Sequence, residues 1–112
     1  MAEITDEFMR QHMAATKDYC IVVLKAGPNQ QMPGADQIIW EHGRRNFALR
    51  EQGLLAIVCP IRDGSEVSGL GIFTTSPTET QQLMDDDPGV QAGVFVYEIH
   101  PCRGFPGDSL PA

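Results

Sequence analysis

The sequence predicts an α+β domain of the ferredoxin-like class, in which two helices cover one face of a four-stranded antiparallel sheet. Three observations support this prediction. A chain of 112 residues is long enough for one hydrophobic core and too short for two. Its content of 42% hydrophobic and 21% charged residues is typical of globular proteins. After an extra N-terminal helix, the apolar segments follow in the order strand, helix, strand, strand, helix, strand, which is the split β-α-β pattern.

The strands are predicted from short apolar runs that end at turn-forming residues. The run "YCIVVLKAG" ends at a glycine and a proline, and "LLAIVCPI" is followed by the turn sequence "RDGSEVSG". The last run, "VFVYEIHP", alternates between two faces. The predicted elements are a helix over 5–16, a strand over 19–27, a helix over 35–52, strands over 54–61 and 70–75, a helix from 77 to before 87, and a strand over 94–101.

Capping residues predict where the helices begin and end. Thr5 can cap the first helix, and Gly53 follows the long second helix as a C-cap. The sequence "SPTE" is a capping box in which Ser76 is the N-cap and Glu79 completes the motif. This helix must end before Asp87, because the ring of the following proline disfavours the α conformation there.

These elements divide the chain into three parts. Residues 1–18 form a helical extension, residues 19–105 form the domain, and residues 106–112 form a tail rich in proline and glycine that we expect to be irregular. A ferredoxin-like sheet leaves one face bare. Because the predicted strands are apolar on both sides, we expect a second copy of the chain to cover that face.

Charge and cysteine content restrict the classes of partner. A net charge of -7 and a pI near 4.7 argue against nucleic acid and anionic membranes as partners. No apolar run approaches the roughly 20 residues that span a bilayer, and the acidic N-terminus does not resemble a secretory signal. The three cysteines form no C-x-x-C pair and no cluster with histidine, so we expect neither a disulfide nor a metal site. A cytoplasmic location follows as the expectation.

One stripe of the long helix combines apolar and polar residues. Ile38, His42, Arg45, Asn46 and Leu49 lie on the side that should face the sheet. Polar side chains at the centre of such a stripe have two interpretations. His42 is either a core histidine bonded to the backbone, or it lines a cleft between helix and sheet and serves as a general acid or base.

Two large aromatic residues project from the opposite side of the same helix. Trp40 and Phe47 lie about 180° from the stripe and should therefore be covered by another surface. The N-terminal helix, with Ile4, Phe8 and its methionines, is one candidate, and a neighbouring subunit is the other. A ligand that stacks on the aromatic rings is a further alternative.

Two long stretches of the sequence resemble the YCII-related (YciI-like) family. They are "EHGRRNFALREQGLLAIVCPIRDG" and "GLGIFTTSPTETQQLMDDDPGVQAGVFVYEIHPCRGF", and the resemblance extends over about residues 19–105. It implies a ferredoxin-like fold that pairs into a dimeric α+β barrel, hence a homodimer. Its most specific positions are His42, Gly53, Pro60, Asp87, Pro88, Ala92 and Gly93.

The resemblance also implies a hypothesis about function. One branch of the family acts as a dehydrochlorinase on a chlorinated hydroxyhydroquinone, and a histidine and an aspartate have been proposed as its catalytic pair. Carried to this sequence, the pair is His42 and Asp87. The hypothesis is a cofactor-independent lyase or isomerase that moves a proton on a small molecule, such as an aromatic one, bound in the helix-sheet cleft. The alternative is a dimeric protein that binds a small molecule, or acts as an accessory protein, without chemistry of its own.

Four further residues are candidates for contact with a substrate. Arg45 could hold an anionic group, or it could be solvated or ion-paired, and Asn46 shares its stripe. Cys59 stands where a glycine commonly precedes the strand-closing proline, and it could narrow the floor of the cleft. Asp63 is expected mainly to form the turn between two strands.

Gly89 replaces the bulky residue that commonly follows Asp-Pro in the family, so it could open the rim of the cleft.

The last of three consecutive aspartates differs from its neighbours. Asp85 and Asp86 should lie in the fraying last turn of a helix and be solvated. Pro88 forces Asp87 out of the helix, and the match to the family's Asp-Pro motif implies that this is the carboxylate aimed at His42. Whether that carboxylate serves catalysis or only caps the turn before the last strand stays open from the sequence.

Overall fold

The sheet has the strand order that the ferredoxin-like class requires. The computed structural model describes residues 3–112 of the chain. Its four strands follow the order β2-β3-β1-β4, and each neighbouring pair is antiparallel. The elements are α1 (Asp6–Ala14), β1 (Lys17–Ala26), α2 (Ala35–Glu51), β2 (Leu55–Pro60), β3 (Val67–Phe73), α3 (Pro77–Asp85), α4 (Pro88–Gln91) and β4 (Phe95–Gly104).

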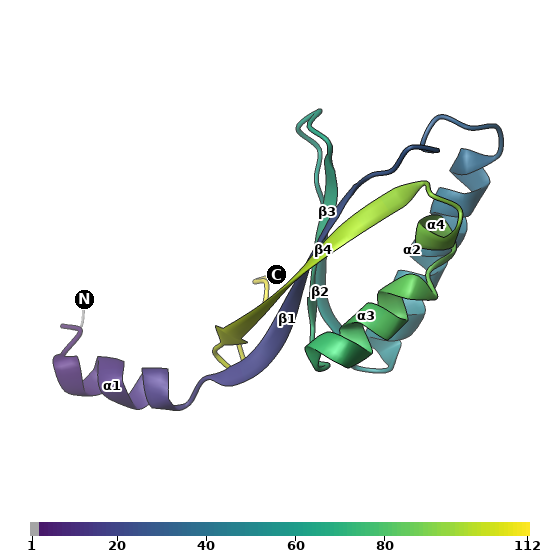
Figure 1. Cartoon of the computed structure of the whole chain (residues 1–112). Helices are drawn as coiled ribbons and strands as arrows, with labels where there is room; N and C mark the ends of the chain where they lie inside the picture. Colours follow the sequence, from purple (N-terminus) through teal and green to yellow (C-terminus); the bar gives the residue numbers. More distant parts are fainter. Residues whose placement is uncertain (1–2) are drawn as a thin grey trace.

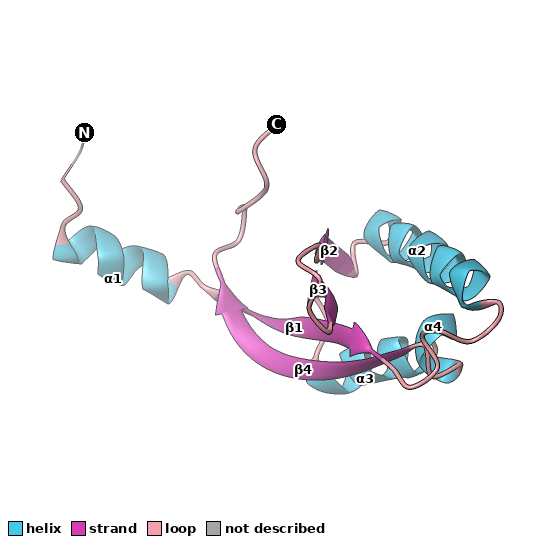
Figure 2. Cartoon of the chain, turned by 90° about the horizontal axis from the view of Figure 1, so that it is seen from above, coloured by secondary structure: helices cyan, strands magenta, loops and turns pink. Residues whose placement is uncertain are grey.

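Three helices cover one face of this sheet and leave the other open. In Figure 1, α2, α3 and α4 all lie to the right of the sheet. Side chains of β1 alternate accordingly, and Cys20, Val22 and Leu24 are buried beneath the helices. Figure 2 shows the same arrangement from above, with the long strands β1 and β4 continuing past the helices towards α1. The predicted fold class is confirmed.

The helix-capping residues predicted from the sequence are confirmed. The Thr5 side chain accepts a hydrogen bond from the Phe8 amide and begins α1. Ser76 and Glu79 form the complete capping box of α3. Beyond the end of α2, Gly53 has a φ of 75°, the left-handed conformation that glycine adopts without steric strain.

The prediction was wrong about two features near the C-terminus. The segment after Asp87 is not a simple turn, because residues 88–91 form the short helix α4. The last strand does not stop at Pro101 but continues to Gly104. Proline is tolerated there because β4 is an edge strand that pairs only with β1, and an edge strand has one side without ladder hydrogen bonds.

The N-terminal helix does not cover the aromatic residues on α2. Helix α1 contributes no buried residue, and it lies at the opposite end of the molecule from α2 in both Figure 1 and Figure 2. Trp40 and Phe47 remain 66% and 64% exposed. Packing of α1 from the same chain against these rings, one of the alternatives considered from the sequence, is therefore excluded. Among the described residues, no helix is long and apolar enough to cross a membrane.

Candidate active site

The site is built on the buried face of α2. Ala35, His42 and Leu49 recur every seven residues, two helical turns apart, and are the buried positions of this helix. His42 therefore occupies a place that an apolar residue would normally take. Its ring packs against the ring of Phe95 at the start of β4, with 4.8 Å between the ring centroids.

Asp87 reaches the same place from the junction between α3 and α4. The Pro88 ring keeps Asp87 out of helical conformation, with φ of -70° and ψ of 133°. Asp87 therefore becomes the N-cap of α4, and its Oδ2 accepts hydrogen bonds from the amides of Gly89 and Val90 at 2.9 and 3.2 Å. Its other oxygen is left free for a second partner.

That second partner is His42. The Nδ1 atom of His42 lies 2.8 Å from Oδ1 of Asp87, and the side chains are 11% and 1% exposed. Burial alone would raise the pKa of Asp87, but the hydrogen bond and charge of His42, together with the Val90 and Gly89 amides, hold it below its ordinary value of 3.8. An ionised carboxylate can only accept hydrogen bonds, so Nδ1 of His42 carries the proton.

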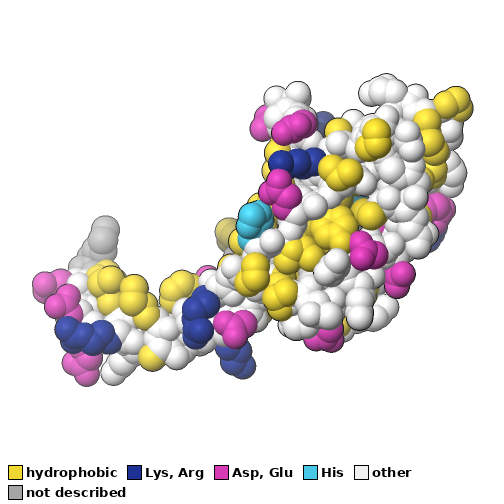
Figure 3. All heavy atoms as spheres, in the orientation of Figure 1, with side chains coloured by type: hydrophobic (Ala, Val, Ile, Leu, Met, Phe, Trp, Pro, Cys, Tyr) yellow, Lys and Arg dark blue, Asp and Glu magenta, His cyan; other side chains and the backbone are white. Residues whose placement is uncertain are grey.

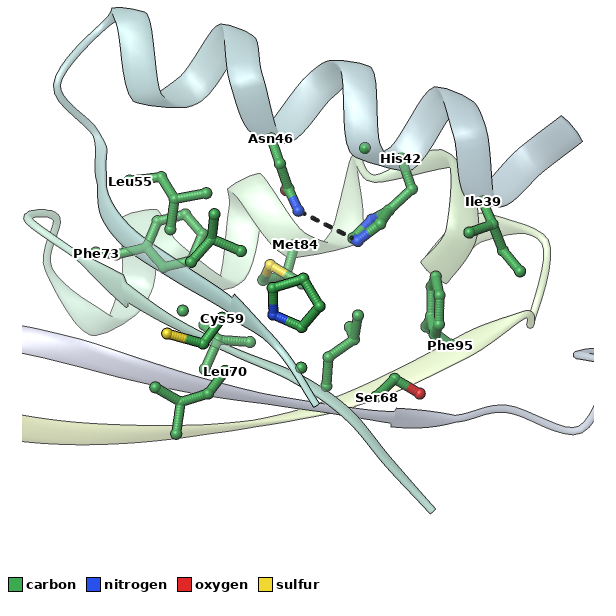
Figure 4. Close-up of a pocket in the computed structure, with 17 residues that line it drawn as sticks. Ile39, His42, Asn46, Leu55, Cys59, Ser68, Leu70, Phe73, Met84 and Phe95 are labelled. Atoms are coloured by element: carbon green, nitrogen blue, oxygen red, sulfur yellow. Dashed lines mark hydrogen bonds between the residues drawn. The ribbon is translucent and has the colours of Figure 1, made fainter. Parts of the chain in front are cut away.

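Asn46 meets the other nitrogen of the imidazole. Its Nδ2 lies 3.3 Å from His42 Nε2, one helical turn along α2. In neutral imidazole with its proton on Nδ1, Nε2 carries a lone pair and accepts from this amide. Figure 4 shows both side chains pointing from α2 into the same cavity. A ligand that donates a proton to Nε2 must therefore displace the Asn46 amide.

Arg45 lies next to the Asp87 carboxylate of this pair. Nη1 of Arg45 is 3.7 Å from Oδ1 of Asp87, and the arginine side chain is 23% exposed. Arg45 does not line the cavity. Of the two interpretations considered from the sequence, the structure places Arg45 in an ion pair with Asp87.

The cavity between α2 and the sheet has a volume of about 250 Å³ and walls that are almost entirely apolar. His42 and Asn46 supply the polar side chains under α2, and Ser68 lies at the sheet (Figure 4). The full lining consists of Val22, Leu24, Ile39, His42, Gly43, Asn46, Leu55, Val58, Cys59, Pro60, Ser68, Gly69, Leu70, Gly71, Phe73, Met84 and Phe95.

The remaining candidate residues divide into two groups. Cys59 lines the cavity, as expected, and is a half-buried free thiol. Asp63 lies in the exposed turn between β2 and β3, where its Oδ1 accepts from the Ser65 amide at 2.9 Å, and it does not line the cavity. The structure thus brings His42, Asp87, Asn46, Arg45 and Cys59 to the site or its immediate support, and leaves Asp63 outside.

Gly89 does not open the rim of the cavity, contrary to the expectation from the sequence. It is buried, and a Cβ at this position would lie 2.6 Å from Phe95 Cδ2 and 3.0 Å from Asp87 Oδ2. The Phe95 ring therefore fills the space that a side chain at position 89 would need. Gly89 instead allows Phe95 to lie close to His42.

Asp85 also differs from the prediction that it is simply solvated. It is exposed, but its Oδ1 accepts a hydrogen bond of 2.5 Å from the hydroxyl group of Tyr97 on β4. Partial burial, this hydrogen bond and the charge of Asp85 raise the pKa of Tyr97 to about 12. The contact ties the end of α3 to the sheet, next to the junction that carries Asp87.

Sequence reasoning did not single out Phe95, Met84 or Ser68 as site residues. Phe95 and Met84 are core residues whose side chains also form walls of the cavity, which periodicity cannot distinguish from ordinary core packing. A signal for Phe95 was available, since it follows the Ala92-Gly93 motif by two residues. Among residues 3–112, no cluster of three potential metal ligands occurs.

Comparison with known proteins found similarity to solved structures. No family model matches the sequence, and no curated protein matches it. The chain is similar to the solved structure of 5-chloro-2-hydroxyhydroquinone dehydrochlorinase (TftG) from Burkholderia phenoliruptrix AC1100 in complex with 2,5-dihydroxybenzoquinone. The identity is 18%, the match covers 75% of this chain and 91% of that chain, and the TM-score is 0.48.

Proposed function

We propose that the chain is a cofactor-independent lyase or isomerase in which His42 accepts a proton from a small molecule bound in the cavity. One observation carries the proposal. The buried His42–Asp87 pair presents Nε2, the nitrogen with the lone pair, to a cavity that is otherwise almost wholly apolar. A core histidine needs neither an ionised partner nor an adjoining empty space.

The pair has the arrangement that a general base requires. The Asp87 carboxylate holds the imidazole in one tautomer and stabilises the imidazolium that forms when Nε2 takes a proton. Because both groups are buried, the attraction between the new positive charge and the carboxylate is only weakly screened by water. Hydrogen bonds from His42 and from the two α4 amides keep Asp87 ionised, so the proton stays on the imidazole.

The cavity indicates the size and polarity of the substrate. A cavity of about 150 Å³ can hold benzene, so about 250 Å³ leaves room for one substituted ring. Its walls suit an apolar ring with a single acidic O–H or C–H directed at Nε2 of His42. Removal of this proton leaves an electron pair that forms a new double bond as a leaving group departs with its own pair, or that is protonated again at another atom.

Activity assays on matched histidine variants test the proposal. Hydroxylated single-ring compounds, with and without a chlorine leaving group, would be screened against the protein by mass spectrometry in D₂O, which reports deuterium uptake as well as product. We expect His42→Asn to lower the rate by about 10²- to 10⁴-fold, the usual contribution of a general base. The matched control, His12→Asn on the exposed helix α1, should retain the full rate. An unchanged rate in His42→Asn would contradict the proposal.

A second function, binding without chemistry, is favoured by a different observation. Asn46 already satisfies His42 Nε2, and within residues 3–112 no buried side-chain nitrogen or oxygen lacks a partner. A site that is complete without a ligand suits a binding or accessory protein as well as an enzyme. In that case a ring compound would raise the melting temperature of the wild-type protein, but no product and no deuterium uptake would appear.

A further inference from the structure

We propose that helix α1 is a docking arm that binds the outer face of α2 in a second copy of the chain. This inference goes beyond the proposed function and does not depend on any chemistry at His42. It rests on two unpartnered apolar surfaces of similar length that the fold keeps apart within one chain. The first is the arm stripe, formed by Ile4, Phe8, Met9 and Met13, and the second is the α2 groove, lined by Asp36, Ile39, Trp40, Gly43, Arg44 and Phe47.

The arm stripe lies on one side of a helix that touches almost nothing else. Phe8, Met9 and Met13 are 45%, 45% and 58% exposed, and Ile4, just before the helix, is 61% exposed. At 100° per residue, Phe8, Met9 and Met13 fall within one arc, while Arg10 lies outside it. Figure 3 shows hydrophobic side chains gathered along α1, away from the rest of the molecule. An isolated helix of nine residues is only marginally stable in water and needs such a face to be buried.

The α2 groove offers the complementary shape. Trp40 and Phe47 lie two turns apart on α2, and Gly43 between them has open space where a Cβ would be. The two rings therefore form the ends of a hollow with half-buried Ile39 at its side. Ridges of side chains on one helix pack into hollows of this kind on another.

Docking within one chain is prevented by the way α1 is attached. Arg103 on β4 donates to the hydroxyl and the carbonyl of Thr16 at 2.9 and 3.0 Å, which holds the junction between α1 and β1. Beyond this point α1 is about 14 Å long, whereas the longest dimension of the molecule is 56 Å. The arm cannot reach its own α2, at the opposite end (Figure 1).

Charge complementarity points to a second copy as the partner and to an antiparallel contact. In that orientation, Asp6 at the start of α1, which pairs with Arg10 in its own chain, would lie near Arg44 of α2, which pairs with Glu41. Arg10, nearer the end of the arm, would lie towards Asp36 at the start of the groove. The helix dipoles would also oppose one another. One chain thus carries both halves of a matched contact.

The emission of Trp40 tests the proposal, because it is the only tryptophan in the chain and lies in the groove. We expect its emission to move to shorter wavelength as protein concentration rises, since docking of the arm removes the indole from water. Phe8→Asp should abolish this shift, whereas the control Gln11→Asp, which adds the same charge to α1 away from the arm stripe, should preserve it.

Each other outcome overturns the proposal. Short-wavelength emission that does not change on dilution would mean that something other than reversible association of two copies covers Trp40, since the arm cannot reach its own α2. Emission characteristic of an exposed indole at every concentration would mean that no copy of the arm binds the groove. A shift that survives in Phe8→Asp would mean that another surface covers Trp40.

Mixing two defective variants gives an independent test. Phe8→Asp lacks a functional arm but keeps the α2 groove, whereas Phe47→Asp keeps the arm but lacks the groove. We expect neither variant alone to show the shift, and we expect an equimolar mixture to recover part of it. A mixture that behaves as the sum of its components would contradict docking between copies.

Discussion

Asp87 performs two tasks with its two oxygens, and this division is the key feature at the scale of single residues. One oxygen caps α4 and the other orients His42. The sequence left open whether this carboxylate serves catalysis or only caps the turn before the last strand. In the structure it caps α4 and also contacts His42, because Pro88 places Asp87 outside the helix while α4 begins immediately after it.

The first prediction concerns acid stability. Because the pKa of folded Asp87 lies below the value of the unfolded chain, near 3.8, its ionised form stabilises the fold above that pH, and the contribution is lost as pH falls through the folded pKa. We expect Asp87→Asn to lower the free energy of unfolding by about 1–3 kcal/mol at pH 7. The difference from wild type should shrink below about pH 4 in urea titrations. A difference that stays constant down to pH 2 would contradict this role.

The resemblance to the YCII-related family implied the pairing of His42 with Asp87 but not its surroundings. The residue pattern alone showed a histidine on an apolar helical stripe and an aspartate before a proline, without linking them. The contacts of Arg45 with Asp87 and of Asn46 with Nε2 depend on side-chain directions and on the depth of the cavity, which sequence spacing does not determine.

At the scale of elements, the site depends on close packing between α4, β4 and α2. Gly89 on α4 has no space for a side chain because the Phe95 ring lies against it, and the same ring packs on His42. The backbone of α4 therefore approaches β4 closely. This contact fixes both the wall of the cavity and the position of the Asp87 carboxylate.

Two glycine substitutions test this packing. We expect Gly89→Ala to lower the free energy of unfolding by about 1–3 kcal/mol, since its Cβ would lie 2.6 Å from Phe95. Gly43→Ala, the matched control on α2, has open space at its Cβ and should instead stabilise the protein by about 0.5–1 kcal/mol. Chemical denaturation would measure both. Equal effects of the two substitutions would rule out the proposed contact.

Local signals explain which elements could be predicted. The capping box of α3 and the glycine after α2 are short-range motifs, and the structure confirms both. Helix α4 has four residues, too few for a periodic pattern, so it could not be recognised. The extension of β4 through Pro101 depends on its place at the edge of the sheet, which is a property of the whole fold.

At the scale of the whole molecule, the open face of the sheet is the surface on which we propose that the homodimer forms. Ile21, Val23 and Ile72 alternate with the residues beneath the helices and are only half-buried. Val96 on β4 is 45% exposed. A second copy packed sheet to sheet would cover this apolar face.

Mass measurements on three variants test this dimer. In the Phe8→Asp background, which removes the proposed arm contact, we expect a mass near twice the 12.3 kDa of one chain by light scattering. Adding Ile72→Lys at the centre of the open face should yield monomers, because it would bury an unpaired charge. Adding Gln82→Lys on the exposed side of α3 should leave the dimer intact. A monomer in the Phe8→Asp protein itself would refute the interface.

The tautomer of His42 tests the central claim most directly. Nitrogen NMR of ¹⁵N-histidine-labelled protein, with His42 assigned from the His42→Asn spectrum, reports which ring nitrogen carries the proton. The account predicts that neutral His42 holds its proton on Nδ1 and a lone pair on Nε2, and that Asp87→Asn abolishes this preference. A proton on Nε2 in the wild-type protein, or exchange between the two tautomers as in a free imidazole, would contradict it.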